Sequence, residues 1–445
     1  MDTKHLHKRR EELMRIMGDG VAIVPTAQVC ARNRDVYFPF RADSDFYYLT
    51  AFPEPEALAV FVPERIEGQF LLFCRDKDPE RELWDGPRTG PEGARAIYGA
   101  DEAYPISMAD RIIPALLENR RKIFYSMGRH TGLDARTIGW LNEVRSHARA
   151  GVAAPAQIVD LDHILHELRL IKHPEEIKLM RQAARISAGA HRRAMRACRP
   201  GMHEYELEAE LLYEFKKQGS EFPAYSPIVG GGRNTCILHY IENRAVLKDG
   251  DLVLIDAAAE LDGYAADITR TFPVNGRFSG PQRELYEVVL AAQCAAIDTV
   301  RPGNHWNDPH DRAVRILTEG LVSLGLLKGP VEDLIASGAY RRFYMHRTGH
   351  WLGLDVHDVG DYKVDGNWRM LEAGMTLTVE PGLYVHEGED VDPRFWNTGI
   401  RIEDDILVTQ SGCEILSANA PKTIDDIEQV MRSHRPAREC SARRA

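Results

Sequence analysis

Short apolar runs alternate with amphipathic segments along the first part of the chain. Residues 5–17 and 134–149 mix charged and apolar positions at helical spacing, so each predicts a helix. Three runs rich in Val, Ile, Leu and Phe predict strands, at residues 20–26, 57–63 and 68–74. This alternation of helices and strands predicts an α/β domain.

A long amphipathic helix is predicted directly after this domain. Pro174 suits the first helical position, and Glu175 and Glu176 follow in the first turn, where the helix dipole favours negative charge. Apolar residues then recur at steps of three and four, at Ile177, Met180, Ala184 and Ala188. The Pro-Gly pair at 200–201 ends this helix.

We place the domain boundary just before this helix, at about residue 172. The sequence then predicts an N-terminal domain over residues 1–172, a second domain over 173–431 and a basic, disordered tail over 432–445. In the second domain the pattern predicts further helices at 203–219, 282–299 and 308–327. Strands are predicted around 225–275 and through most of 343–410, which together indicates an α+β domain.

Composition narrows the class of protein. The chain has 445 residues, enough for two domains, and a formal net charge of −11, which argues against a nucleic-acid binder. No apolar run is long enough to cross a membrane, and the charged N-terminal segment is unlike a secretory signal. The seven cysteines are scattered without a CxxC pair, which favours reduced thiols in a cytoplasm.

Two aspartates carry the first sign of chemistry. Asp256 ends an apolar strand, and Asp267 follows eleven residues later, beyond a turn predicted around 261–263. A two-residue loop would place them directly opposite each other on one face of a hairpin, with Cβ atoms roughly 4.5–5.5 Å apart. Such a pair repels unless a proton or a cation lies between the carboxylates. The alternative is equally open: Asp256 only ends a strand and Asp267 lies on a solvated edge.

Further acidic and imidazole side chains stand in apolar surroundings downstream. Glu380 follows a β-branched strand, and Glu403 is predicted inside an alternating strand. Either alone is more often a surface residue, but a buried glutamate without a partner is costly. The segment MHRTGHWLGLDVHDVG (345–360) adds three histidines, for which a metal site, a proton relay or a plain core strand is possible; His305 and His310 are expected at the surface.

Together these residues indicate a metal centre. Four carboxylates and one imidazole would balance the charge of two divalent ions, and an oxygen-rich set of ligands suits Mn²⁺, Co²⁺ or Zn²⁺. Two such ions can polarise a shared water and clamp a hydrolytic transition state. The remaining histidines would then contact the substrate or donate protons to it.

The order and context of these residues resemble a known family, the pita-bread metallopeptidases, which include methionine aminopeptidase, prolidase and aminopeptidase P. The segments HWLGLDVHDVG, VEPGLY and GIRIEDD are similar to those of aminopeptidase P in particular. This resemblance implies an α/β N-terminal domain of the creatinase/prolidase type and an α+β pita-bread catalytic domain. It also implies five metal ligands: Asp256, Asp267, His350, Glu380 and Glu403.

The resemblance implies roles for these and other residues. Asp267 would bridge two ions, preferably Mn²⁺, and Glu380 would also accept the proton of the attacking water. Substrate contact and proton relay would fall to His346, His357 and His239, with Arg401 and Tyr384 in support beside the metals. One departure concerns residues 347–349, which are Arg-Thr-Gly here but Gly-Leu-Ser in the aminopeptidases P that the segment resembles.

The implied activity is removal of an N-terminal residue that precedes proline, by a cytoplasmic homodimer or homotetramer. The nearest alternative is prolidase, which uses the same ligands but takes only Xaa-Pro dipeptides. A non-catalytic binding protein of the same fold is a second alternative, and a creatinase-like hydrolase without metal a third. The presence of all five ligand residues argues against both of these.

Overall fold

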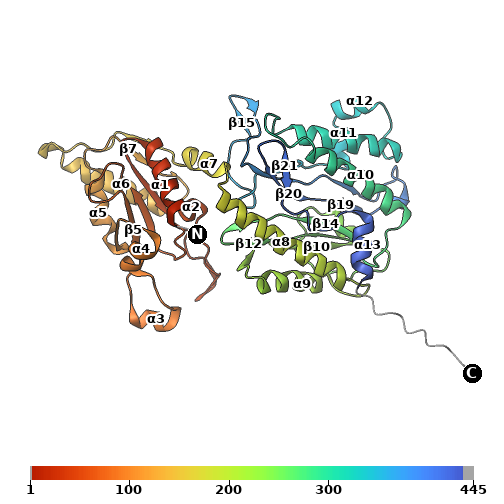
Figure 1. Ribbon diagram of the computed structural model, residues 1–445, viewed down its shortest axis with the longest axis horizontal. Helices are drawn as coiled ribbons and strands as arrows, with labels where there is room; N and C mark the ends of the chain where they lie inside the picture. Colours follow the sequence, from red (N-terminus) through yellow and green to blue (C-terminus); the bar gives the residue numbers. More distant parts are fainter. Residues whose placement is uncertain (1–2, 434–445) are drawn as a thin grey trace, which may run out of the picture. The chain divides into compact units, whose positions relative to one another are not determined.

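The structure is a computed structural model that describes residues 3–433 (Figure 1). The chain divides into two compact units between Arg169 and Leu170. Most of the predicted basic tail, residues 434–445, lies outside the described residues. None of the described helices is long and apolar enough to cross a membrane.

The first unit is built on a mixed sheet of six strands. Their order is β6 (Glu102–Pro105), β5 (Phe70–Cys74), β4 (Leu58–Phe61), β1 (Val21–Pro25), β7 (Lys122–Phe124) and β8 (Gln157–Val159). Strand β1 pairs antiparallel with β4 and parallel with β7. Helices accompany this sheet: α1 (Thr3–Met17), α2 (Ser44–Thr50), α3 (Pro79–Asp85), α4 (Gly90–Tyr98), α5 (Ala109–Leu117), α6 (Thr131–Ser146) and α7 (Asp162–Leu170). The predicted α/β class is confirmed.

The apolar runs form strands because both faces of this sheet are covered. Residues of β1, β4 and β5 are buried on successive positions, without the alternation of a half-exposed strand. Val21, Val60 and Leu71 pack with Trp140 and Val144 of α6 in one apolar core. Outside this sheet, β2 (Ala31–Asn33) and β3 (Val36–Tyr37) form a short exposed hairpin.

The second unit places several small sheets between helices (Figure 1). The helices are α8 (Pro174–Ala197), α9 (Glu204–Lys217), α10 (Gly280–Ile297), α11 (Asp308–Ser323), α12 (Val331–Ala336) and α13 (Ile424–Arg432). One sheet has the order β10 (Ile228–Gly231), β11 (Leu252–Asp256), β14 (Thr269–Pro273), and another the order β17 (Thr376–Val379), β20 (Asp404–Val408), β21 (Cys413–Ile415).

Shorter strands complete this unit. These are β9 (Phe222–Pro223), β12 (Ala259–Leu261) and β13 (Tyr264–Ala265) in one sheet, β18 (Gly382–Val385) with β19 (Thr398–Arg401), and β15 (Lys363–Val364) with β16 (Asn367–Trp368). The α+β prediction is confirmed. Two details are wrong: residues 343–362 contain only an isolated bridge at Trp351, and Glu403 lies between β19 and β20 instead of inside a strand.

Two glycines allow residues 345–360, a loop, to pack closely against their neighbours. A Cβ atom on Gly349 would collide with the carbonyl oxygen of Thr378, and one on Gly353 would collide with the carboxylate of Asp358. Because Gly349 has no Cβ atom, the loop can lie directly against β17. In that position the backbone N–H of His350 donates to Thr378 Oγ1 at 3.1 Å.

A buried ion-pair network stabilises β14 and β20, the strands that follow Asp267 and Glu403. Arg270 and Asp404 are both 0% exposed as side chains, and Arg270 Nη2 lies 2.6 Å from Asp404 Oδ1. Lys422 Nζ lies 2.7 Å from Asp404 Oδ2, and Gln293 Nε2 donates to the same oxygen. The Arg270 guanidinium also donates to the carbonyl oxygen of Glu403.

We expect Arg270→Ala to lower the free energy of unfolding by about 3–5 kcal/mol, because it leaves backbone carbonyls and a buried carboxylate short of donors. Denaturant titration of the whole chain measures this change. The matched control is Arg181→Ala, which breaks an exposed pair with Glu414 and should cost about 0–1 kcal/mol. Equal losses in the two variants would contradict the assignment of Arg270 as a buried structural cation.

Candidate metal centre

A cavity of about 240 Å³ in the second unit collects most of the residues predicted to form the site. It is lined by Leu238, His239, Asp256, Asp267, His346, Arg347, Gly349, His350, His357, Glu380, Arg401 and Glu403. All five predicted metal ligands are among them. Of the predicted site residues, only Tyr384 is not part of the cavity lining. Its hydroxyl lies 2.9 Å from Nε2 of His346.

Strand ends aim the carboxylates into this cavity. Asp256 is the last residue of β11, Asp267 lies two residues before the start of β14, and Glu380 directly follows β17. Asp256 pairs with Thr269, so Asp267 lies diagonal to Asp256. The predicted direct opposition of the two aspartates is therefore wrong.

The reason is the position of the turn. The loop between β12 and β13 consists of Asp262 and Gly263, with Leu261 already paired to Tyr264. Both loop residues have positive φ, 48° and 81°, as a type I′ hairpin turn requires. The turn thus begins one residue later than the sequence suggested, which shifts the register while leaving both aspartates on one face.

The side chains converge closely. Nε2 of His350 lies 3.2 Å from Oδ2 of Asp267 and 3.8 Å from Oε1 of Glu380. Asp267, His350 and Glu403 each offer a ligand atom, and these atoms lie within 4.8 Å of one another. On the other side of Asp267, the hydroxyl of Tyr225 lies 2.5 Å from Oδ1 of both Asp256 and Asp267.

Burial and mutual repulsion act on the carboxylates. Burial raises the pKa of Glu380 to about 7, against the opposing charges of His350 and Arg401. Burial, followed by the charge of Asp267, raises the pKa of Glu403 well above its usual range. Carboxylates that repel each other in a dry site become stable anions when a cation lies among them. The donor set, carboxylate oxygens with one imidazole nitrogen, fits divalent metal ions.

The three loop histidines differ in charge. Burial lowers the pKa of His346 to about 4, and the neighbouring Arg401 lowers it further, so this imidazole is neutral. Burial also lowers the pKa of His357, with the charge of His350 as the next cause. For His350, burial opposes protonation, but the hydrogen bond and charge of Asp267 outweigh it and raise the pKa to about 9.

Arg401 links one metal-ligand candidate to one of the neutral histidines. Its Nη2 donates to Asp256 Oδ2 at 2.6 Å, and its Nη1 donates to the Tyr384 hydroxyl at 3.0 Å, which in turn reaches His346. Its Nε donates to Thr269 Oγ1 at 3.1 Å. The guanidinium thereby fixes the orientation of Asp256 and of the hydroxyl beside His346.

Several supporting residues escaped the sequence analysis. Thr269 donates through Oγ1 to Glu403 Oε2 at 2.6 Å, and Asp405 accepts the backbone N–H of Asp267. His310 is not a plain surface residue as predicted: it is partly buried, and its Nδ1 lies 2.9 Å from Thr348 Oγ1. Thr269 and Asp405 each lie two residues after a predicted ligand, Asp267 and Glu403. This spacing is the signal in the sequence that could have identified them.

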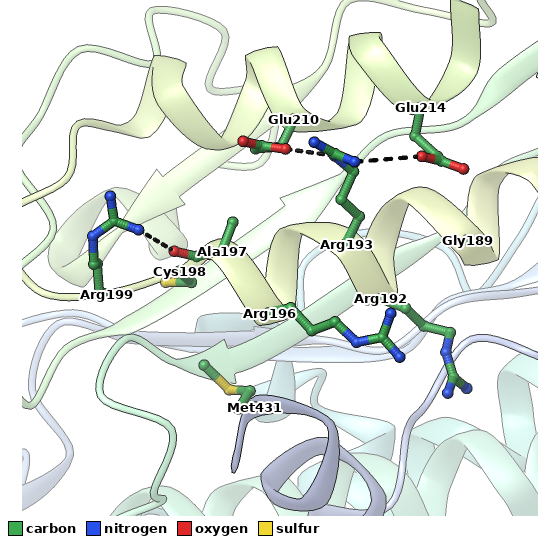
Figure 2. Close-up of a pocket in the computed structure, with 10 residues that line it drawn as sticks. All are labelled: Gly189, Arg192, Arg193, Arg196, Ala197, Cys198, Arg199, Glu210, Glu214 and Met431. Atoms are coloured by element: carbon green, nitrogen blue, oxygen red, sulfur yellow. Dashed lines mark hydrogen bonds and ion pairs between the residues drawn. The ribbon is translucent and has the colours of Figure 1, made fainter. Parts of the chain in front are cut away.

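Two other clusters in the described residues lack this chemistry. A cavity of about 660 Å³ at the end of α8 is lined by four arginines, and its carboxylates, Glu210 and Glu214, both pair with Arg193 (Figure 2). In the first unit, Asp45, Asp162 and His166 lie close enough for a shared ion. There, however, Arg129 pairs with both aspartates and Arg169 with Asp45, so their charge is already neutralised.

Comparison with known proteins identifies the family. The model of metallopeptidase family M24 matches residues 178–410, more than half of the chain. The chain belongs to metallopeptidase family M24. The model of the aminopeptidase P N-terminal domain matches residues 6–125. The resemblance to aminopeptidase P and its pita-bread fold is therefore confirmed.

Relatives of this M24 chain match it over nearly its full length. The Xaa-Pro aminopeptidase of Escherichia coli is 44% identical, covering 97% of this chain and 98% of its own. The structure of Pseudomonas aeruginosa aminopeptidase PepP superposes with a TM-score of 0.97 at 54% identity, covering 98% of this chain and 99% of that one. A zinc-substituted E. coli aminopeptidase P with product gives a TM-score of 0.95 at 43% identity, covering 98% of this chain and 100% of that one.

We expect Asp267→Ala to abolish stoichiometric metal binding while the fold persists, because Asp267 stands between His350, Glu403 and the Asp256 side of the cluster. Metal content after dialysis against Mn²⁺, measured beside the thermal unfolding midpoint, checks both statements. Asp361→Ala removes an exposed aspartate outside the cavity and serves as the control. Retention of full metal content in Asp267→Ala would refute the assignment of this residue as a ligand.

Proposed function

We propose that this chain is an Xaa-Pro aminopeptidase, which releases the first residue from peptides with proline in second position. The observation that carries the proposal is the convergence of Asp256, Asp267, His350, Glu380 and Glu403, from separate segments, in one cavity with neutral histidines. The printed names of the relatives favour the same activity, since those proteins are Xaa-Pro aminopeptidases.

In this proposal the five residues would hold two divalent ions, Mn²⁺ in preference to Co²⁺ or Zn²⁺, and Asp267 would be a ligand to both. Bound metals supply Lewis acidity and lower the pKa of a water nucleophile. The donor set supports the proposal, because four buried or partly buried carboxylates bring enough negative charge to compensate two divalent ions.

The chain's own side chains move the protons. Glu380 accepts the proton of the attacking water on a carboxylate oxygen, a role supported by its place in the cavity lining directly after β17. His346 contacts the substrate as a neutral imidazole, held by the Tyr384 hydroxyl. His239 lines the same cavity, as does its neighbour Leu238, and completes the group of substrate-contacting histidines.

Proline imposes a particular demand on the leaving group. Its nitrogen carries no N–H in the peptide and departs as a secondary amine, which must gain a proton. His357 lines the cavity with its ring centroid 4.3 Å from that of His350, and we assign it the relay of this proton. Arg401 holds Asp256 and Tyr384 in place throughout.

The same proposal includes a cytoplasmic location and a homodimeric or homotetrameric assembly. Six cysteines in the described residues are free thiols, which favours a reducing compartment. Prolidase remains the second candidate function, because it would use the same ligand set. A non-catalytic binding protein is disfavoured by the presence of every ligand residue in one cavity.

The deciding experiment pairs two substrates on one preparation, stripped with a chelator and then given Mn²⁺. We expect restored cleavage of an Xaa-Pro-Yaa tripeptide, because an aminopeptidase tolerates chain beyond the proline. Cleavage of an Xaa-Pro dipeptide alone would make the chain a prolidase. No cleavage of either, with metal bound, would favour the binding protein.

We expect His357→Ala to lower kcat by roughly 10²–10⁴-fold, the usual contribution of a positioned acid or base, without loss of metal. Steady-state kinetics on the tripeptide together with metal analysis test this. His305→Ala, which removes an exposed histidine, is the control and should leave kcat unchanged. A wild-type kcat in His357→Ala would remove this residue from the proton relay.

A further inference from the structure

Arg347 is an exposed side chain in the lining of the catalytic cavity. Its guanidinium carbon lies 5.1 Å from the centre of the Trp368 ring, and one of its N–H groups donates to Asn307 Oδ1. The ammonium of Lys363 lies 4.4 Å from the centre of the same ring. Stacking on an aromatic face and a hydrogen bond to an amide both reduce the number of positions that the guanidinium samples.

Within residues 3–433, no carboxylate lies at ion-pair distance from Arg347. Asn307 accepts a hydrogen bond from only one of its two terminal nitrogens, Nη2. Arg401, the other arginine in the lining, is buried and donates to Asp256, Tyr384 and Thr269. Arg347 therefore presents free donors and a positive charge to whatever occupies the mouth of the cavity.

The charge of the cavity lining differs between its buried and its exposed residues. Asp267 and Glu403 are buried, whereas Arg347 is exposed. This inference rests on the proposed function, and it adds that the first residue of the peptide lies at the carboxylates. A volume of about 240 Å³ is smaller than the roughly 300–1,000 Å³ of pockets that enclose drug-sized ligands, so the peptide beyond proline must leave across the rim.

We propose that Arg347 is a specificity-determining residue that favours peptides with a carboxylate directly after the proline. A guanidinium presents paired N–H donors that match the two oxygens of a carboxylate, which makes it selective for that group over an amide. Two sources can supply the carboxylate: the C-terminus of a tripeptide, or an acidic side chain at the third position of a longer peptide.

The test uses four substrates on the Mn²⁺-loaded full chain. One pair is an Xaa-Pro-Ala tripeptide with a free C-terminus and the same tripeptide as its C-terminal amide. The other pair is Xaa-Pro-Glu-Ala and Xaa-Pro-Gln-Ala, both as C-terminal amides. We expect KM to be about threefold to fivefold lower for the carboxylate member of at least one pair at low salt, the size of an exposed ion pair. The difference should shrink in 0.5 M salt.

Three variants assign the effect. Arg347→Gln removes the charge at similar length, and we expect the ratio of KM values within the responding pair to fall to about one. Arg347→Lys keeps the charge but not the fork, so it should retain part of the ratio. The matched control is Lys363→Gln, which removes a charge from the same ring but lies outside the cavity lining, and it should keep the wild-type ratio.

The outcomes separate the sources and the hypotheses. A preference in the tripeptide pair identifies the terminal carboxylate, and one in the longer pair identifies an acidic side chain; either supports the proposal when Arg347→Gln abolishes it. Wild-type indifference in both pairs, persistence of the ratio in Arg347→Gln, or its loss in Lys363→Gln would overturn the proposal. If the wild type cleaves none of the four substrates, the proposed function fails, and this inference fails with it.

Discussion

Four carboxylates, two buried and two partly buried, lie close together and constrain the structure of the second unit. Asp256, Asp267, Glu380 and Glu403 line one small cavity, and burial raises the pKa of three of them. In a low-dielectric site such a group can be fully ionised only when cations lie within it. The rest of the unit acts to keep these oxygens in place despite their repulsion.

Neutral hydroxyls and a few cations hold these oxygens in place. Thr269 donates to Glu403, Tyr225 contacts both aspartates, and Arg401 donates to Asp256. Further back, Arg270 fixes the carbonyl oxygen of Glu403 and neutralises Asp404. The carboxylate positions are therefore determined by hydrogen bonds and ion pairs from residues around them, as the positions of metal-ligating carboxylates commonly are.

The sequence predicted what local patterns determine and missed what tertiary contacts determine. Glu380 was placed correctly at a strand end because its neighbours are strongly β-forming. The register of Asp256 and Asp267 was wrong because Asp262-Gly263 moved the turn by one residue. His310 and Tyr225 went unrecognised because their partners, Thr348 and the two aspartates, are distant in sequence, and no spacing rule links them.

Residues 345–360 combine two tasks that can change independently. His350 faces the carboxylates and is fixed by Thr378 of β17, so its position follows from backbone contacts. Thr348 is buried, with its hydroxyl 2.6 Å from that of Tyr344. Arg347, in contrast, is exposed and is held only by surface partners. We therefore expect a substitution at Arg347 to alter the charge beside the cavity while His350, three residues later, keeps its backbone contacts with Thr378.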